Sequence, residues 1–150
     1  MAQSLSQVYV HITFSTKHRR PLIDESIAPD FWGYMGGLCK ARECVPVRIG
    51  GHDDHAHICC LLSKKITQIK LLEEVKKESS HWVKTRGGHY GDFYWQDGYG
   101  IFSVNPSEIE TVAAYIDGQR EHHKKRTFQE EFLAFLKKYG VKYDERYLWD

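Results

Sequence analysis

The first hydrophobic pattern along the chain is a strict alternation near its start. Val8, Val10, Ile12 and Phe14 occupy every second position. A strand turns every second side chain to the same face, so this spacing predicts a strand with one buried face. Short apolar runs bounded by glycine or charged residues predict three more strands, at residues 43–51, at residues 55–63 and at the end of the stretch 87–104.

Helical periodicity is clearest between residues 64 and 84, where charged residues separate apolar ones. The apolar positions recur every third residue and are Ile66, Ile69, Leu72 and Val75. Residues 25–42 have a weaker helical spacing, because they contain three glycines that each cost about 1 kcal/mol relative to alanine.

Two further helices are predicted in the last third of the chain. One begins at Asn105, a good capping residue, followed by Pro106 at the first helical position. It extends to about residue 125. The other covers residues 127–140 and ends at Gly140.

The order of these elements is strand, helix, strand, strand, helix, strand, with additional helices at the C-terminus. This order predicts an α+β fold of the ferredoxin-like or RRM-like split βαβ type, with a central antiparallel sheet. The chain has 150 residues, of which 41% are hydrophobic and 13% aromatic. This length and composition predict one folded domain over residues 1–150, with no linker or internal repeat.

The sequence gives no sign of a membrane or secreted protein. No apolar run approaches the ~20 residues that cross a bilayer, and the first ten residues do not resemble a signal peptide. The four cysteines form no C-x-x-C pair; they are Cys39, Cys44, Cys59 and Cys60. Reduced thiols and a cytoplasmic location are therefore expected.

Candidate chemistry is concentrated in residues 50–60, which read GGHDDHAHICC. On a strand His55 and His57 share a face with Cα atoms ~6.6 Å apart, close enough for two imidazoles to bind one metal. Cys59 lies ~13 Å from His55 by the same arithmetic, too far to join them. His52, in the preceding loop, is a further candidate. The alternative is a pair of half-exposed histidines at a strand edge.

The predicted helix from Asn105 carries a second pair of polar residues. Tyr115 and Gln119 are four positions apart and therefore project from the same side of a helix. A glutamine carbonyl oxygen is a suitable ligand for a hard metal ion, and the tyrosine hydroxyl would then lie beside the same ion. The alternative is a surface tyrosine with a hydrogen-bonded glutamine.

Taken together, His-x-His followed much later by Tyr-x-x-x-Gln resembles the HUH single-tyrosine transposases. These are small single-strand transposases of insertion sequences, with domesticated relatives that act on repeated extragenic palindromes. The segments TKHRRP, YWQDGYGIFSV and REHHKKRTFQEEFLAFLKKYG are also similar to that family. The resemblance covers nearly the whole chain, although Ala56 is smaller than the bulky apolar residue often found between the two histidines.

The resemblance implies a role for each motif residue. His55, His57 and Gln119 would bind a divalent metal, Mg²⁺ or Mn²⁺, and Tyr115 would be the catalytic nucleophile that forms a 5′-phosphotyrosine intermediate. The substrate would be single-stranded DNA with hairpin-marked ends. A homodimer is also implied, in which the tyrosine helix of one subunit can complete the histidine site of the other.

Binding to a single strand requires cations for the phosphates and flat rings for the bases. The net charge is only +1, so we expect a limited basic patch and recognition of a folded hairpin. Lys17, Arg19 and Arg20 are the leading candidates for phosphate contacts. The remaining candidates for DNA contacts are Lys64, Lys65 and Arg126 for phosphates, with Trp95 and its neighbour Tyr94 for base stacking.

Three other functions remain open from the sequence. The protein could be a domesticated endonuclease that processes chromosomal palindromes. It could instead hold zinc through His52, His55, His57 and a cysteine. The third alternative is a ferredoxin-like nucleic-acid-binding module without catalysis.

Overall fold

A computed structural model describes residues 2–150 and contains a four-stranded antiparallel sheet. The strands lie in the order β2-β3-β1-β4, so β1 and β3 are the central ones. Their bounds are Tyr9–Ser15 for β1, Val45–His52 for β2, His55–Leu61 for β3 and Gly100–Val104 for β4.

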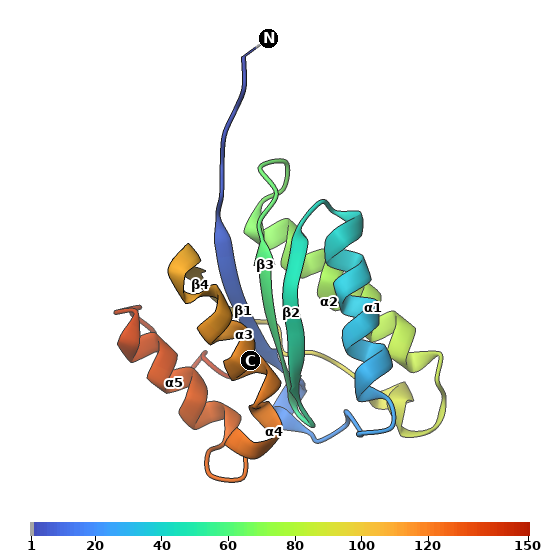
Figure 1. Ribbon diagram of the computed structural model, residues 1–150. Coiled ribbons are helices and arrows are strands. Elements are labelled where there is room, and N and C mark those ends of the chain that lie inside the picture. Colours follow the sequence, from blue (N-terminus) through green and yellow to red (C-terminus); the bar gives the residue numbers. More distant parts are fainter. Residues whose placement is uncertain (1) are drawn as a thin grey trace.

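Helices cover both faces of this sheet (Figure 1). On one face lie α1 (Ala28–Ala41) and α2 (Gln68–Lys84), which connect β1 to β2 and β3 to β4. The other face is covered by α3 (Ile109–Asp117), α4 (Gln119–His122) and α5 (Phe128–Lys138). Three short 3₁₀ helices complete the structure: η1 (Lys17–Arg19), η2 (Gly88–Asp92) and η3 (Pro106–Glu108). The α+β fold expected from the sequence is confirmed, because both βαβ units are split by a strand that pairs between their own two strands.

Alternate side chains of β1 are buried on opposite faces of the sheet, which differ in polarity. Val10, Ile12 and Phe14 enter the hydrophobic core under α1 and α2. His11 and Thr13, on the opposite face, are equally buried. The sheet therefore has an apolar side and a buried polar side, and the polar side is the one that α3 and α5 cover.

The apolar stripe of α2 is displaced from the one predicted. Leu71, Leu72 and Val75 are buried, whereas Ile69 is 65% exposed. The helix begins at Gln68, after Thr67 has accepted a hydrogen bond from the Lys70 amide. Ile69 thus falls in the first turn on the solvent side, and the every-third-residue pattern was wrong at that position.

The single helix predicted from Asn105 to about residue 125 is divided. Asn105 caps η3, and a break at Gly118 separates α3 from α4. Glycine has a low helix propensity, which accounts for a break at this position. The side-chain Nε2 atom of Gln119 donates to the carbonyl oxygen of Tyr115 at 3.3 Å, and both side chains still contact histidines of β3.

Close approach of α3 to the sheet depends on a glycine. A Cβ at Gly50 in β2 would lie 2.9 Å from Cγ2 of Ile116, closer than real Cβ contacts allow. The absence of a side chain at Gly50 therefore lets α3, which carries Tyr115, pack directly on β2.

Helix α5 has well-defined ends. Thr127 and Glu130 form a capping box at its start, and Gly140 takes a positive φ of 64° just beyond its end. Phe128, Phe132 and Leu136 pack against Phe102 of β4 as a second, smaller core. This packing fixes α5 over the polar face of the sheet.

Among residues 2–150, no helix is both long and apolar enough to cross a membrane. All four cysteines are unpaired thiols and are buried. The expectation of reduced cysteines is therefore confirmed.

Candidate active site

His55 and His57 lie on the buried polar face of β3 and are completely inaccessible to solvent. Their intervening residue, Ala56, points into the hydrophobic core on the opposite face. The alternative of two half-exposed histidines at a strand edge is wrong, because β3 is a central strand and helices cover it. Buried imidazoles require polar partners, and each ring nitrogen of this pair has one.

The partner of His57 on the sheet is a third histidine. His11 of β1 places its Nε2 atom 2.8 Å from Nδ1 of His57. This hydrogen bond fixes the ring of His57 so that its Nε2 atom points away from the sheet, toward α5. The sequence analysis missed His11, although the alternation of β1 already placed it on the polar face.

His55 lies between two acceptor oxygens. Asp54 Oδ1 is 2.7 Å from its Nδ1 atom, and Gln119 Oε1 is 2.8 Å from its Nε2 atom. A neutral imidazole carries a single N–H, so it can donate to only one of these oxygens. A cation bound between Nε2 of His55 and Oε1 of Gln119 would satisfy both lone pairs. The donor set therefore fits a metal ion.

A carboxylate that the sequence analysis missed completes this cluster. Glu131 of α5 places its Oε1 atom 2.9 Å from Nε2 of His57 and 3.8 Å from Nε2 of His55. Among residues 2–150, these three are the group whose ligand atoms converge, all within 4.8 Å of one another. A signal existed in the sequence, because Glu131 interrupts the apolar stripe formed by Phe128, Phe132 and Phe135.

Tyr115 reaches the same cluster from α3. Its ring lies edge-on to the ring of His57, with 5.7 Å between centroids. Its hydroxyl donates a hydrogen bond to Oε2 of Glu131 and lies 3.3 Å from Nε2 of His122. The phenol oxygen is therefore separated from the histidine pair by a single carboxylate, and every group involved belongs to one chain.

Burial and charge set the protonation of these groups. Burial lowers the pKa of His57 to about 4 and that of His11 to about 3. Burial would raise the pKa of Glu131, but hydrogen bonds from His123 and His57 outweigh it and hold the pKa well below its usual range. Burial, and then the charge of Glu131, raise the pKa of Tyr115 far above its usual value. At neutral pH, His57 is thus uncharged, and the phenol keeps its proton.

The lowered pKa values predict an acid-sensitive fold. Between pH 6.5 and about 4, His57 and His11 bind protons in the unfolded chain but not in the folded one. Their contribution to stability is complete above pH 6.5 and is lost as the pH falls through that window. We expect the melting temperature of the metal-free protein to decrease steadily from pH 7 to pH 4.5, measured by circular dichroism. A constant melting temperature over this range would contradict the burial of neutral histidines.

A thiolate zinc site has little support in this geometry. Cys59 shares the face of His55 and His57, but it does not belong to the group of described residues whose ligand atoms converge. His52 stacks on His123 with 5.7 Å between ring centroids and does not join the converging group of the described residues. The available donors are imidazole nitrogens with carboxylate and amide oxygens.

The proposed DNA-contacting cations do not form one patch. Lys17, Arg19 and Arg20 follow the end of β1 that lies beside His55. Lys64 and Lys65 follow the opposite end of β3, and Lys65 is paired with the carboxylate of Glu43 at 3.1 Å. Arg126 is exposed in the loop before α5.

Trp95 cannot stack on a DNA base as the sequence analysis expected. Its side chain is 7% exposed and packs against Phe14, Phe31 and Phe93, and its Nε1 atom donates to Ser79. This prediction was wrong because Phe14 and Phe31, which are distant in the sequence, pack around the ring together with the neighbouring Phe93. Its neighbour Tyr94 is 58% exposed and remains available, with Nζ of Lys84 4.0 Å above its ring.

Comparison of the sequence with known protein families identifies the family of this chain. The sequence profile described as "Transposase IS200 like" matches residues 4–119. This chain belongs to that transposase family. The match includes His55, His57, Tyr115 and Gln119, and it ends before Glu131.

Two solved structures share the fold of this transposase-family protein. A candidate transposase of Deinococcus radiodurans R1 has a TM-score of 0.62 at 15% identity, over 79% of this chain and 98% of that one. A REP-associated tyrosine transposase bound to a REP hairpin has a TM-score of 0.58 at 15% identity, over 82% of this chain and 74% of that one. No curated protein sequence matches the chain. Family membership makes this protein a DNA-processing enzyme.

Proposed function

We propose that this protein is a metal-dependent transposase for single-stranded DNA, which cleaves and rejoins strands at hairpin-marked ends through a 5′-phosphotyrosine. One observation carries the proposal: the hydroxyl of Tyr115 is hydrogen-bonded to Glu131, whose other oxygen contacts His57. A tyrosine in contact with a candidate metal cluster has no role in simple DNA binding, and this argues against a non-catalytic module.

The metal ligands would be His55, His57 and Gln119, with Glu131 as a fourth. Imidazole nitrogens combined with carboxylate and amide oxygens suit Mn²⁺ and Mg²⁺. When bound, such an ion supplies positive charge that polarises the scissile phosphate and stabilises the oxygens on which negative charge develops. Asp54 and His11 would hold the two imidazoles in place from the second ring nitrogen of each.

The chain supplies the nucleophile and its proton acceptor. The oxygen of Tyr115 attacks the phosphorus, and its proton passes to His122, whose Nε2 atom lies 3.3 Å away and is a stronger base than the Glu131 carboxylate. The bond from phosphorus to the 3′-oxygen breaks, and that oxygen leaves as a hydroxyl after taking a proton from water. Because a phenol has a pKa of about 10, far below that of an alcohol, a 3′-hydroxyl can later displace the tyrosine and reseal the strand.

The cluster is largely closed to solvent. His55, His57, Gln119 and Glu131 are buried, whereas Tyr115 and His122 are partly exposed. We propose that a phosphate approaches past these two side chains, through an opening beside α5. A flexible single strand can bend into such an opening more easily than a duplex, and this supports a single-stranded substrate.

This restricted opening predicts strong discrimination against duplex DNA. We expect an oligonucleotide cleaved as a single strand to be cleaved at least ~100-fold more slowly after annealing to its complement, because near-attack geometry is lost. Rates measured on denaturing gels, with a hairpin flanked by single strands as the reference substrate, give this ratio. Equal rates on both forms would contradict the single-strand assignment.

Glu131 gives a separate prediction about the metal. Glu131→Gln removes the only carboxylate of the cluster, so we expect the affinity for Mn²⁺, measured by isothermal titration calorimetry, to fall at least ~10-fold. Glu121→Gln is the matched control, since Glu121 is exposed on α4 and pairs with Lys124. An unchanged affinity in Glu131→Gln would remove Glu131 from the ligand set.

Recognition of a DNA hairpin has more support than formation of a homodimer. The solved relative bound to a REP hairpin supports hairpin recognition by this chain. The homodimer remains a prediction from the family resemblance. Since Tyr115 contacts the cluster of its own chain, the proposed active site does not require a tyrosine from a partner.

The same relative keeps a second function open, the processing of chromosomal palindromes by a domesticated enzyme. Both functions share the cleavage step and differ in whether strands are rejoined to a new target. The general experiment is therefore to incubate the protein with labelled single strands, a hairpin and Mg²⁺ or Mn²⁺. A denaturation-resistant protein–DNA adduct supports the proposal, and its absence under all these conditions would contradict it.

A further inference from the structure

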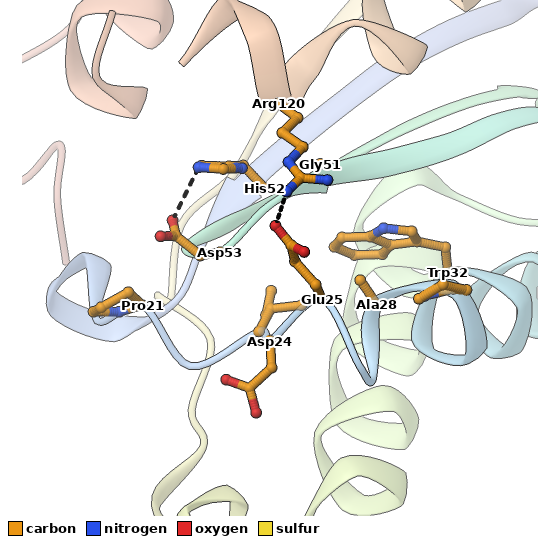
Figure 2. Close-up of a pocket in the computed structure, with 11 residues that line it drawn as sticks. Pro21, Asp24, Glu25, Ala28, Trp32, Gly51, His52, Asp53 and Arg120 are labelled. Carbon is orange, nitrogen blue, oxygen red and sulfur yellow. Dashed lines mark ion pairs between the residues drawn. The ribbon is translucent and has the colours of Figure 1, made fainter. Parts of the chain in front are cut away.

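A cleft of about 520 Å³ lies beside the metal-binding cluster and is not used by the mechanism above (Figure 2). One wall consists of Ala28, Pro29 and Trp32 at the start of α1. Glu25, Asp53 and Arg120 add charged groups at its edges. The cleft therefore combines a flat aromatic surface with a few polar side chains, the usual composition of a small-ligand site.

The chain connects this cleft directly to the cluster. Arg120 follows Gln119, and Asp53 precedes Asp54, whose carboxylate is hydrogen-bonded to His55. His52, which also lines the cleft, stacks on His123, and His123 is 2.9 Å from Oε1 of Gln119. A DNA strand with one phosphate at the cluster would bring a neighbouring nucleotide to this cleft.

The charges in the cleft exclude two kinds of ligand. Asp24, Glu25 and Asp53 outnumber the one arginine, so a phosphate group would be repelled. These carboxylates also do not converge into a metal-binding group, since the described residues form such a group only at His55, His57 and Glu131. An uncharged, flat ligand that donates hydrogen bonds fits better.

We propose that this cleft holds one nucleobase of the substrate strand and that it prefers guanine. The inference rests on the proposed function, because it assumes a single-stranded DNA substrate. Trp32, which stacks on Phe31, provides a rigid surface on which a base can stack. Figure 2 shows Arg120 and Glu25 reaching toward each other beside the Trp32 indole.

Guanine matches this pair of charged groups. Its N1–H and N2–H groups are adjacent donors for the Glu25 carboxylate, and its O6 and N7 atoms accept from the Arg120 guanidinium. Both side chains are mostly exposed, and an exposed ion pair is weak enough to open for a ligand. Thymine presents one N–H to the carboxylate and one carbonyl oxygen beside it to the guanidinium, so it can form fewer of these hydrogen bonds than guanine.

The test uses free nucleosides and nuclear magnetic resonance of the protein labelled with ¹⁵N. The chain has four tryptophans, whose indole N–H signals can be assigned by single Trp→Phe variants. Deoxyguanosine at millimolar concentration should shift the Trp32 signal and leave those of Trp82 and Trp149 in place. Thymidine should require at least ~5-fold higher concentration for the same shift.

Glu25→Gln should reduce the preference for deoxyguanosine over thymidine from at least ~5-fold to less than ~2-fold. Arg146→Gln is the matched control, since Arg146 forms an exposed pair with Asp144 away from the cleft, and it should behave like the unmodified protein. A Trp32 signal that does not move with any nucleoside would overturn the proposal. Equal shifts with deoxyguanosine and thymidine, or an unchanged preference in Glu25→Gln, would also overturn it.

This measurement is independent of cleavage. A protein that binds deoxyguanosine at Trp32 but forms no DNA adduct would support the base-binding cleft and contradict the proposed function. A protein that forms the adduct but shows no preference among nucleosides at Trp32 would support the proposed function and contradict the base-binding cleft.

Discussion

Tyr115→Phe should abolish the covalent protein–DNA adduct and reduce strand cleavage by at least ~10⁴-fold, as expected when a nucleophile is removed. The variant loses one hydroxyl, and Glu131 then keeps its hydrogen bonds to His57 and His123. The ring of Tyr115 still packs edge-on against Phe135, so the fold should be retained. Binding of a labelled hairpin, measured by gel shift, should change less than ~3-fold, because a single half-buried hydroxyl contributes little to an interface.

Tyr143→Phe is the matched control for this experiment. Tyr143 is exposed beyond α5 and has no contact with the cluster. It should form adducts at the normal rate. Adducts that persist in Tyr115→Phe, or that disappear in Tyr143→Phe, would assign the nucleophile to another residue.

His57→Ala should remove metal-dependent cleavage, with a loss of at least ~100-fold at any concentration of Mn²⁺ or Mg²⁺. The imidazole is a proposed ligand and also accepts or donates at both ring nitrogens, to His11 and to Glu131. Its removal leaves Nε2 of His11 without its partner, which costs about 1–3 kcal/mol of folding free energy, whereas Glu131 keeps its hydrogen bonds to Tyr115 and His123. Both activity and stability should therefore decrease.

Two comparisons separate these effects. His57→Gln keeps a polar side chain in the cavity, so it should recover part of the melting temperature without recovering cleavage. His81→Ala, on the exposed side of α2, should leave both quantities unchanged. Normal cleavage rates in His57→Ala would discredit the ligand set, whatever the stability of that variant.

Local patterns in the sequence were sufficient for most of the fold. The alternation in β1 identified a strand with Ile12 and Phe14 in the core, and the capping and stop signals of α5 lie where they were expected. Ile69 was misplaced because spacing alone does not fix where a helix begins. The division at Gly118 was missed because a helical sequence pattern continues across it.

The candidate site was only partly predictable, because half of it is built from long-range contacts. His55 and His57 lie on one strand, and Tyr115 and Gln119 are one helical turn apart, so their spacing revealed them. Glu131 meets His57 across 74 positions of sequence, a contact that no local pattern encodes.

Long-range contacts also explain why Trp95, which was predicted to bind DNA, is buried instead. A tryptophan in a glycine-rich segment suggests an exposed ring, but Phe14 and Phe31 come from distant segments and pack around it, beside the neighbouring Phe93, only when the chain folds. Its burial depends on elements that are distant in the sequence, and so does the loss of its expected role in stacking on DNA.

The most direct measurement is a crystal structure of the protein grown with Mn²⁺, located by its anomalous scattering. We expect one strong peak in contact with Nε2 of both His55 and His57, with the Tyr115 oxygen next to it in the same chain. A peak elsewhere, with the space between these imidazoles and Tyr115 empty at saturating Mn²⁺, would contradict the proposed metal site.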